Sequence, residues 1–444
     1  MENILITLDQ LGIGGVETHV VNQVKILRKL GKNVFVMSKK GSYVDTIKST
    51  NAKFVEHEFS YKTYYDKDEV DFIANFIKKN NITQVQVNQF TAINAIVPAC
   101  LLTNTPYVAY LHIGVGFLND PEKNPFDFFE KQYFTYKKMF EMFFKNASAV
   151  VTITEVLKNY TAQRYNVDKD KIFVRPNSID TSEFKGKRPV KKVEKIFVIG
   201  RLSEEKELSI INSIDLYKNL KEKNKNAKLA IAGDGPCREN IENYVLDNNI
   251  EDVEFLGAIS NVKEEMDNYD LVIGQGRCLL EAMSMKKLAF ISGYDHLKGF
   301  VDEKNFGRCI NDNFTGKSLN RKPINKLMLE IEKLNEKEIK ELINTNHKKL
   351  VEKLDATKNV FCLNERSFKG YDSISVYKDM IELIDLLGKQ EKEYHDKADE
   401  IWKAYKNYEK RMNKRYFLFE KILRFNKKAY LGFKRILNMS EDRG

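Results

Sequence analysis

The feature that most constrains the fold of this chain is a strand–helix alternation that runs through its first 390 residues and pauses once. Short β-branched runs, apolar through their middles, alternate with longer helical patterns. Such runs are typical of parallel strands buried on both faces, and the alternation indicates right-handed βαβ units. The pause lies at residues 175–190, RPNSIDTSEFKGKRPV, where two of the eight prolines fall, and we predict an interdomain linker there.

The expected elements form two halves of similar design. Before the linker we expect strands at Asn3–Leu8, Asn33–Ser38, Phe54–Glu58, Thr83–Val87, Tyr107–His112 and Val150–Thr154. The helices expected between them are Val16–Leu30, Val70–Lys79, Ala92–Leu102, Phe126–Phe144 and Glu155–Tyr165. After the linker we expect strands at Lys195–Ile199, Lys228–Ala232, Val253–Leu256, Leu271–Ile273 and Leu288–Ser292. The helices of this second half are expected at Leu208–Glu222, Arg238–Leu246, Val262–Tyr269 and Cys278–Met285.

These patterns predict an α/β fold of two Rossmann-like, doubly wound domains that face each other across a cleft. Such sheets bind ligands at the carboxyl ends of their strands. We place the first domain at residues 1–178 and the second at 179–370, with an amphipathic helix at 371–390 that packs back on the first domain. Residues 391–444 are expected to form a basic, aromatic helical extension.

The composition predicts a folded chain that holds no metal. Hydrophobic residues make up 42% of the 444 residues, enough for sizeable cores. No apolar run approaches the roughly 20 residues of a membrane span, and the start, MENILITLDQ, is typical of a strand and not of a signal peptide. The five cysteines form no CxxC pair and the six histidines form no HExxH pattern. We therefore expect a cytoplasmic protein with reduced thiols and no metal bound by its side chains.

The positive charge is concentrated near the end of the chain. Residues 401–436 contain twelve Lys or Arg and two acids, and their net charge of +10 equals that of the whole chain. The rest is balanced, which argues against a nucleic-acid-binding protein. Aromatic residues are interleaved with the bases over 401–437, and three interpretations stay open. The segment lies on an anionic membrane, which would place the protein at the inner face of the cell membrane, or it joins copies of the chain, or it binds a polyanion.

A glycine loop follows the first expected strand in LDQLGIGGVET, residues 8–18. Gly14 and Gly15 would let backbone approach a ligand, and the free N–H groups of the next helix would face a phosphate. The spacing is not GxGxxG, and the second strand runs into Lys39 and Lys40 instead of an acid, which argues against an NAD site. The structural alternative is a tight β–α turn.

Two cations flank the loop after a strand in FVIGRLSEEKE, residues 197–207. Arg201 and Lys206 at a strand's carboxyl end would neutralise a diphosphate, and would stabilise its charge if it departs. The alternative is ion pairing with Glu204 and Glu205 on a solvated loop.

A third segment, LVIGQGRCLLEAM, residues 271–283, carries a lone acid in an apolar stretch. Glu281 in that setting requires a partner, and a carboxylate can accept both hydroxyl hydrogens of a ribose. The alternative is an acid favoured by the helix dipole.

Two weaker features complete the set. IAGDGP, residues 231–236, contains Gly233 and is typical of a structural βα turn, with Pro236 at the first helical position. His112 ends a strand in YVAYLHIGVG, residues 107–116; a lone histidine is more often packed than catalytic, but its place at the cleft edge favours a function.

Together these segments resemble a known family. GIGGVETHVVNQVKILRKLGKNVFVMS, VRPNSIDTSEF, IGRLSEEKE, IAGDGP and LLEAM, in this order and spacing, resemble the retaining GT-B glycosyltransferases of family 4, and the resemblance covers about residues 1–390. It implies a nucleotide-sugar cleft between two Rossmann-like domains, no metal or other cofactor, and sugar transfer with retention of anomeric configuration.

The resemblance also implies roles for residues at matching positions. Arg201 and Lys206 correspond to the pair on the donor diphosphate, and His112 to a histidine near the donor sugar, so these three are the catalytic candidates. The donor-binding candidates are Gly14 and Gly15 of the glycine loop, Gly233, Gly276, Arg277, and Glu281, which corresponds to the ribose-binding acid.

One departure concerns the E-x7-E element of that family. Its first Glu, which with the following residues contacts the donor sugar, should stand at position 273, where this sequence has Ile273. We expect a sugar pocket rebuilt around Gly276 and Arg277, and the added cation would suit an acidic sugar or an extra phosphate. Ser178 stands in the linker where the family often has Gly.

The resulting prediction is a metal-independent hexosyltransferase that moves a sugar from a nucleoside diphosphate sugar, a UDP-sugar first of all, to an acceptor hydroxyl. The Lys-, Asn- and Ile-rich composition indicates a bacterial polysaccharide, a polyol phosphate such as teichoic acid, or a lipid-linked glycan as acceptor. The alternatives are a non-catalytic scaffold that binds nucleotide sugar or a partner subunit, and an epimerase of GT-B architecture.

Overall fold

The structure is a computed structural model. It describes residues 2–12, 14–60, 66–88, 93–112, 134–259, 261–294, 296–361 and 363, and single helical positions between 376 and 403. The chain divides into one unit of residues 1–382 and another of residues 383–444. The predicted extension 391–444, apart from four helical positions, and the first eight residues of the predicted helix Phe126–Phe144 lie outside the described residues.

Seven parallel strands form the sheet of the N-terminal half, in the order β3-β2-β1-β4-β5-β6-β7. They are β1 (Asn3–Gln10), β2 (Asn33–Lys39), β3 (Lys53–Glu56), β4 (Gln84–Val87), β5 (Tyr107–Leu111), β6 (Ala149–Thr152) and β7 (Ile172–Val174). The helices between them are α1 (Gly15–Lys29), α2 (Val44–Ser49), α3 (Lys67–Lys79), α4 (Ile93–Leu102), α7 (Phe134–Asn146) and α8 (Glu155–Tyr165). The strand order reverses between β1 and β4, which makes that crevice the topological switch point of the sheet.

The helices of this half form where apolar residues recur at helical spacing behind a cap. The Asp66 side chain accepts the Glu69 N–H at 3.4 Å at the start of α3, whose buried residues include Val70, Ile73 and Ile77. Thr154 caps α8 in the same way, by accepting the Leu157 N–H at 3.1 Å.

Six strands form the sheet of the C-terminal half, in the order β10-β9-β8-β11-β12-β13, with only β13 antiparallel to its neighbour. They are β8 (Lys195–Ile199), β9 (Lys228–Ala232), β10 (Val253–Gly257), β11 (Leu271–Gly274), β12 (Leu288–Ile291) and β13 (Gly299–Phe300). The helices are α9 (Glu204–Lys223), α10 (Arg238–Asp247), α11 (Val262–Met266), α12 (Arg277–Ser284), α13 (Phe306–Asn311), α14 (Ile324–Glu332) and α15 (Glu336–Leu354).

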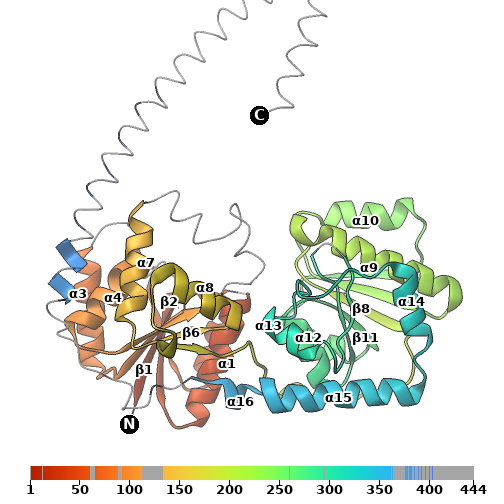
Figure 1. Cartoon of the computed structure of the whole chain (residues 1–444), viewed down its shortest axis with the longest axis horizontal. Coiled ribbons are helices and arrows are strands. Elements are labelled where there is room, and N and C mark those ends of the chain that lie inside the picture. Colours follow the sequence, from red (N-terminus) through yellow and green to blue (C-terminus); the bar gives the residue numbers. More distant parts are fainter. Residues whose placement is uncertain are drawn as a thin grey trace, which may run out of the picture. The chain divides into compact units, whose positions relative to one another are not determined.

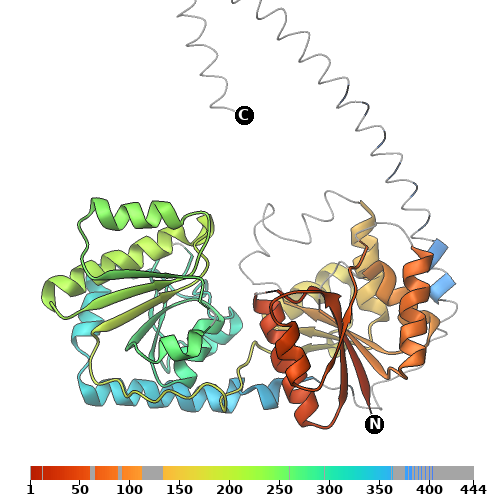
Figure 2. The same cartoon turned by 180° about the vertical axis from the view of Figure 1, so that it is seen from behind.

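Two apolar layers enclose this second sheet (Figures 1 and 2). Helices α9, α10 and α14 cover one face, and α11, α12, α13 and the end of α15 cover the other. Neighbouring strand residues alternate between the two layers, as Ile196 and Phe197 do, so this parallel sheet is buried on both sides as its apolar sequence predicts.

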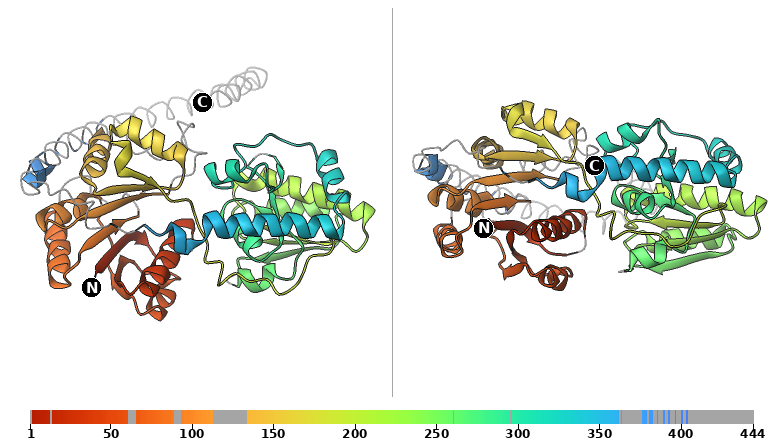
Figure 3. Two further views of the ribbon diagram at one scale, coloured as in Figure 1. Left: turned by 60° about the horizontal axis from the view of Figure 1, so that its bottom comes forward. Right: turned by 90° about the horizontal axis from the view of Figure 1, so that it is seen from below.

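The chain passes between the two sheets twice, and the two passages pair with each other. Ile179 donates its N–H to the Leu354 carbonyl at 3.0 Å, and Ala356 donates to the Ile179 carbonyl at 2.9 Å. After the short helix α16 (Ala356–Asn359), Phe361 joins a core cluster of the N-terminal half. The described helical residues of 376–382 lie beside α3 (Figures 1 and 3), where Met380 is buried.

The predicted α/β class with two doubly wound, Rossmann-like domains is confirmed. Every predicted strand is present with bounds shifted by at most two residues, while β7, β13, α2 and the helices α13–α16 were not predicted. Residues 175–190 contain no helix or strand beyond a single bridge at Ile179. Among the helices of the described residues, none has the length and apolar character needed to span a bilayer.

Candidate functional site

The topological switch point of the C-terminal sheet lies between β8 and β11, which pair in parallel. Carboxyl ends of neighbouring parallel strands meet at one sheet edge, so the loop after β8 and the turn after β11 are neighbours. Cys278 lies between their charged groups. Burial raises the pKa of its thiol to about 12, the negative charge of Glu281 adds to this shift, and the positive charge of Lys206 opposes it.

The loop after β8 carries both predicted diphosphate cations. Arg201 is exposed, and Lys206 is partly buried in the first turn of α9. The Lys206 ammonium lies over Gly200, since a Cβ at that glycine would be 3.9 Å from its Nζ. Among the described residues no ion pair joins either cation to Glu204 or Glu205. Burial works to raise the pKa of Glu205, but hydrogen bonding by Ser203 and the charges of Lys206 and Arg201 lower it, so both cations lie within reach of that carboxylate.

Gly233 supports this loop from the neighbouring strand. It adopts φ +146°, and a Cβ there would lie 1.9 Å from the Gly200 carbonyl oxygen. Gly235, with φ +154°, is similarly confined, because a Cβ there would lie 2.3 Å from the Leu202 carbonyl oxygen. The IAGDGP segment is therefore needed for close backbone packing under Arg201, and donor contact by Gly233 stays a prediction.

The turn after β11 places an ion pair at the start of α12. Gly276 precedes the helix with φ +66° and ψ −128°, a conformation that favours glycine. One turn apart on α12, the Arg277 Nε donates to Glu281 Oε1 at 3.0 Å, and the two side chains are only 20% and 12% exposed. Burial raises the pKa of Glu281, and Arg277 opposes that shift.

The first position of the E-x7-E element, occupied in this chain by Ile273, faces the core. Ile273 lies within β11, is fully buried and belongs to the apolar layer under α9. A carboxylate there would point into the core and not toward a ligand. Only Gln275 and Gly276 separate β11 from α12, so the connection between this strand and its helix is short.

In the N-terminal half, His112 directly follows β5 and belongs to a polar group that the sequence did not reveal. Its Nε2 lies 2.9 Å from Asn88 Oδ1, and its ring meets the His19 ring edge-on at 4.7 Å between centroids. Burial lowers the pKa of His19 to about 4, with the Arg277 charge adding to the shift. Burial, with His19, also lowers the pKa of His112, so both imidazoles are neutral at physiological pH.

In the glycine loop of this half, Gly15 is exposed and the carboxylates of Glu17 and Asp9 are near. Gly15 is the exposed first residue of α1, and no atom lies within 4 Å of a Cβ placed there. At Gly14 a Cβ would collide with the Glu17 carboxylate at 2.2 Å. Burial, with the Glu17 charge, raises the pKa of Asp9 in β1 to about 6, and Asp9 is a further titratable group that sequence reasoning missed.

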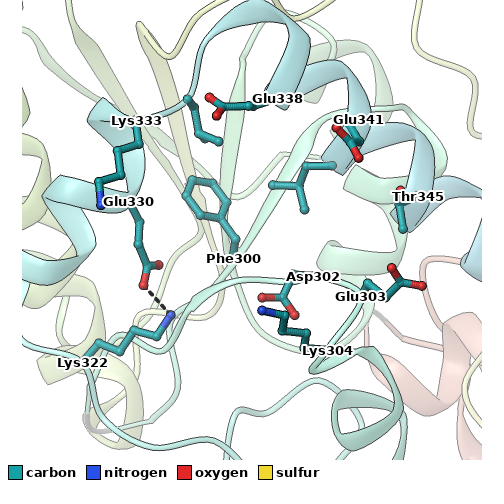
Figure 4. A pocket seen from close by; sticks show the side chains of 12 residues that line it. Phe300, Asp302, Glu303, Lys304, Lys322, Glu330, Lys333, Glu338, Glu341 and Thr345 are labelled. Atoms are coloured by element: carbon teal, nitrogen blue, oxygen red, sulfur yellow. Dashed lines mark hydrogen bonds and ion pairs between the residues drawn. The ribbon is translucent and has the colours of Figure 1, made fainter.

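A cavity of about 460 Å³ lies elsewhere, beside β13 (Figure 4). Its lining mixes five carboxylates with three lysines around Phe300, and Lys322 pairs with Glu330 at 2.7 Å. It belongs to the sheet edge formed by β13, α14 and α15, away from the β8–β11 switch point, and its charges oppose one another. We therefore take the switch point, and not this cavity, as the candidate site.

Two doubly wound, Rossmann-like sheets in one chain are the architecture of the GT-B class of fold. Residues 13–183 match the family model Glycosyltransferase Family 4, and residues 180–350 match the model Glycosyl transferases group 1. The chain therefore belongs to the GT-B glycosyltransferases.

Solved structures with the same fold include three other proteins at low sequence identity. A glycosyltransferase from Rickettsia africae ESF-5 is 16% identical, with a TM-score of 0.59 over 87% of this chain and 98% of the other. Anabaena HepE, solved with UDP and glucose, is 16% identical, with a TM-score of 0.59 over 81% and 97%. TarM is 13% identical, with a TM-score of 0.58 over 87% and 99%. The comparison with curated proteins found no match.

The predicted site residues lie in two groups, each at the carboxyl ends of the strands of one sheet. Arg201, Lys206 and the Gly276–Glu281 turn share the switch point of the C-terminal sheet. His112 and the glycine loop follow β5 and β1 of the N-terminal sheet. The unpredicted members are His19, Asn88, Asp9 and Gln275, and single polar residues of this kind carry no periodic signal in a sequence.

Proposed function

We propose that this protein transfers a sugar from a nucleoside diphosphate sugar, a UDP-sugar first of all, to an acceptor hydroxyl, with retention of configuration and without a metal. The observation that carries the proposal is the pairing of β8 with β11, which gathers Arg201, Lys206 and Glu281 at one switch point. Two cations suit a diphosphate, and a carboxylate suits the two hydroxyl groups of a ribose.

The proposed chemistry depends on charge stabilisation. As the bond between the sugar C1 and the phosphate oxygen breaks, negative charge grows on the leaving diphosphate, and Arg201 and Lys206 stabilise it. The departing phosphate oxygen assists removal of the acceptor proton on the same face, so no nucleophile from the protein is required. His112, held by Asn88 and neutral, is assigned to the donor sugar as a hydrogen-bonding group.

The test combines ligand screening with variants of the two cations. A thermal-shift screen with UDP, GDP, ADP and their sugars should show stabilisation by the cognate donor. Arg201→Ala and Lys206→Ala should each lower turnover roughly 10²-fold or more. Arg321→Ala and Lys218→Ala, which remove similar charges away from the switch point, serve as matched controls. Unchanged turnover in both site variants would overturn the assignment.

A non-catalytic role is the second candidate, and the short turn between β11 and α12 favours it. With Ile273 in the core and only Gln275 and Gly276 before the helix, little backbone is left to contact a donor sugar. A scaffold would bind nucleotide sugar and release no nucleotide in the presence of acceptor extracts. Nucleotide release above the level of the Arg201→Ala and Lys206→Ala variants would exclude this candidate.

For the acceptor we propose a bacterial cell-surface polysaccharide, a polyol phosphate or a lipid-linked glycan. HepE has been solved with UDP-glucose, and S. aureus TarM with fondaparinux, alpha-GlcNAc-glycerol and UDP, which supports donors and acceptors of these classes. We further propose that the basic aromatic residues 401–437 bind an anionic membrane surface. Flotation with anionic liposomes should be lost in a chain ending at residue 390; equal flotation of both chains would reject this location.

A further inference from the structure

We infer that Arg277 is a positioning residue that holds Glu281 ionised and in one orientation for the ribose of the donor. The inference rests on the proposed function of the switch point and concerns the ionisation and orientation of Glu281. It differs from our sequence-based expectation that the extra cation serves an acidic sugar or an additional phosphate.

The geometry of α12 directs the Arg277 charge toward Glu281. The two residues are one helical turn apart, their ion pair measures 3.0 Å, and both side chains are largely buried. The pair uses Glu281 Oε1, and the contacts among the described residues leave Oε2 without a protein partner. One oxygen is thus fixed by the guanidinium while the other can accept a hydroxyl hydrogen.

Among the residues that the structure describes, the guanidinium of Arg277 makes one further contact, which is long. Its NH1 donates to the Ser178 carbonyl at 3.4 Å, a long contact with the linker. On α1, His19 is within reach of the Arg277 charge, but its pKa is lowered by burial and it is a neutral imidazole that cannot pair with a cation. In the described part of the chain, Arg277 forms its ion pair with Glu281, and Arg277 is the charge that acts on the Glu281 carboxylate. The Cys278 thiol is a further titratable group within reach of the Glu281 charge.

Without Arg277, a buried Glu281 would become protonated more readily. Burial raises its pKa and Arg277 is the opposing charge, so removing Arg277 moves the pKa further upward. A raised folded-state pKa stabilises the protein fully below the unfolded value and destabilises it as the pH rises through the folded value. The Arg277→Met variant should therefore lose more stability at pH 8 than at pH 5.

The binding experiment uses titration calorimetry with UDP on the full chain between pH 5.5 and 8.5. We expect Arg277→Met to bind UDP at least tenfold more weakly near pH 6 and to recover affinity as the pH rises, because Glu281 then ionises. Arg277→Lys should restore part of the affinity. In a Glu281→Gln background, Arg277→Met should cause no further loss and no pH dependence.

A second measurement needs no ligand. Urea unfolding midpoints of the wild type and the same variants should show the pH-dependent loss in Arg277→Met and its absence in the Glu281→Gln background. The inference is overturned if Arg277→Met behaves as wild type in both measurements, or if its effects are independent of pH and additive with Glu281→Gln. If the wild type binds no nucleotide of the screen, the proposed function fails, while the unfolding data still decide whether Arg277 keeps Glu281 ionised.

Discussion

Replacing Lys287 with Met should destabilise the C-terminal half strongly. The Lys287 side chain is fully buried between α12 and β12, where its ammonium reaches the linker. Its ammonium forms an ion pair with Asp267 Oδ1 at 3.0 Å and donates to two carbonyls, Asp267 O at 2.8 Å and Arg188 O at 2.9 Å. All three of its N–H donors therefore have acceptors.

The expected loss follows from what the substitution leaves behind. Removing one partner of a buried ion pair costs about 3–5 kcal/mol. The Asp267 carboxylate is 19% exposed and keeps the backbone N–H groups of Lys187 and Arg188 as donors, which places the loss near the lower end. Two carbonyls also lose a donor, so we expect about 3–4 kcal/mol in total.

Urea unfolding followed by circular dichroism measures this loss. With a dependence of about 1–3 kcal/mol per molar urea, the midpoint should fall by roughly 1 M or more. Lys286→Met is the matched control, because the preceding lysine is exposed and its removal should leave the midpoint nearly unchanged. Equal midpoints for the two variants would refute the reasoning that the buried contacts of Lys287 stabilise the fold.

Three further predictions concern the N-terminal half and a fourth the turn under Arg201. Gln86 is fully buried in β4, and neither of its amide atoms has a protein hydrogen bond among the described residues. Gln86→Met should therefore raise the free energy of unfolding, measured in urea, by about 1–3 kcal/mol. His19 has a folded-state pKa of about 4 against an ordinary value of 6.5, so its own contribution to stability should fall by up to about 3 kcal/mol as the pH drops from 6.5 toward 4. Asp9, with a folded-state pKa of about 6, contributes in the opposite direction, so the fall should be read as the difference between wild-type and His19→Gln unfolding curves across the range. Gly15→Ala should leave the melting temperature unchanged or raise it because its Cβ meets no atom, and weakened nucleotide binding in this variant would support donor contact. Gly233→Ala should lower the melting temperature by several degrees, and an unaffected value would show that the backbone there can shift freely.

Much of the fold was predictable because parallel strands buried on both faces are apolar throughout. β8 and β9 have the predicted bounds, and so does α8, which Thr154 caps. The two-residue strand β13 and three-residue strand β7 are too short for periodicity to indicate them. α15 was missed although its sequence carries a signal, since Asn335 and Glu338 form a reciprocal capping box before an apolar repeat.

The candidate site was predictable only where glycines and charges follow strands. Arg201, Lys206 and Glu281 share one switch point because β8 pairs with β11, which the order of motifs along the chain implied. Position 273, where the family has its first Glu, faces the core in this chain, because the strand register buries Ile273. Residue counting from Glu281 does not reveal where the strand ends, and that end decides which side chains reach a ligand.

The two connections between the sheets pair at Ile179 and Leu354, so the C-terminal half is inserted within the N-terminal half. We call these halves the second lobe and the first lobe. The first lobe is completed only by Phe361 and the residues after it, so its polypeptide is discontinuous. A fragment that stops before the second passage would expose the apolar surface which Phe361 covers. Excision of the inserted lobe with a short splice between residues near 178 and 356, in contrast, would keep both pieces of the first lobe in one chain.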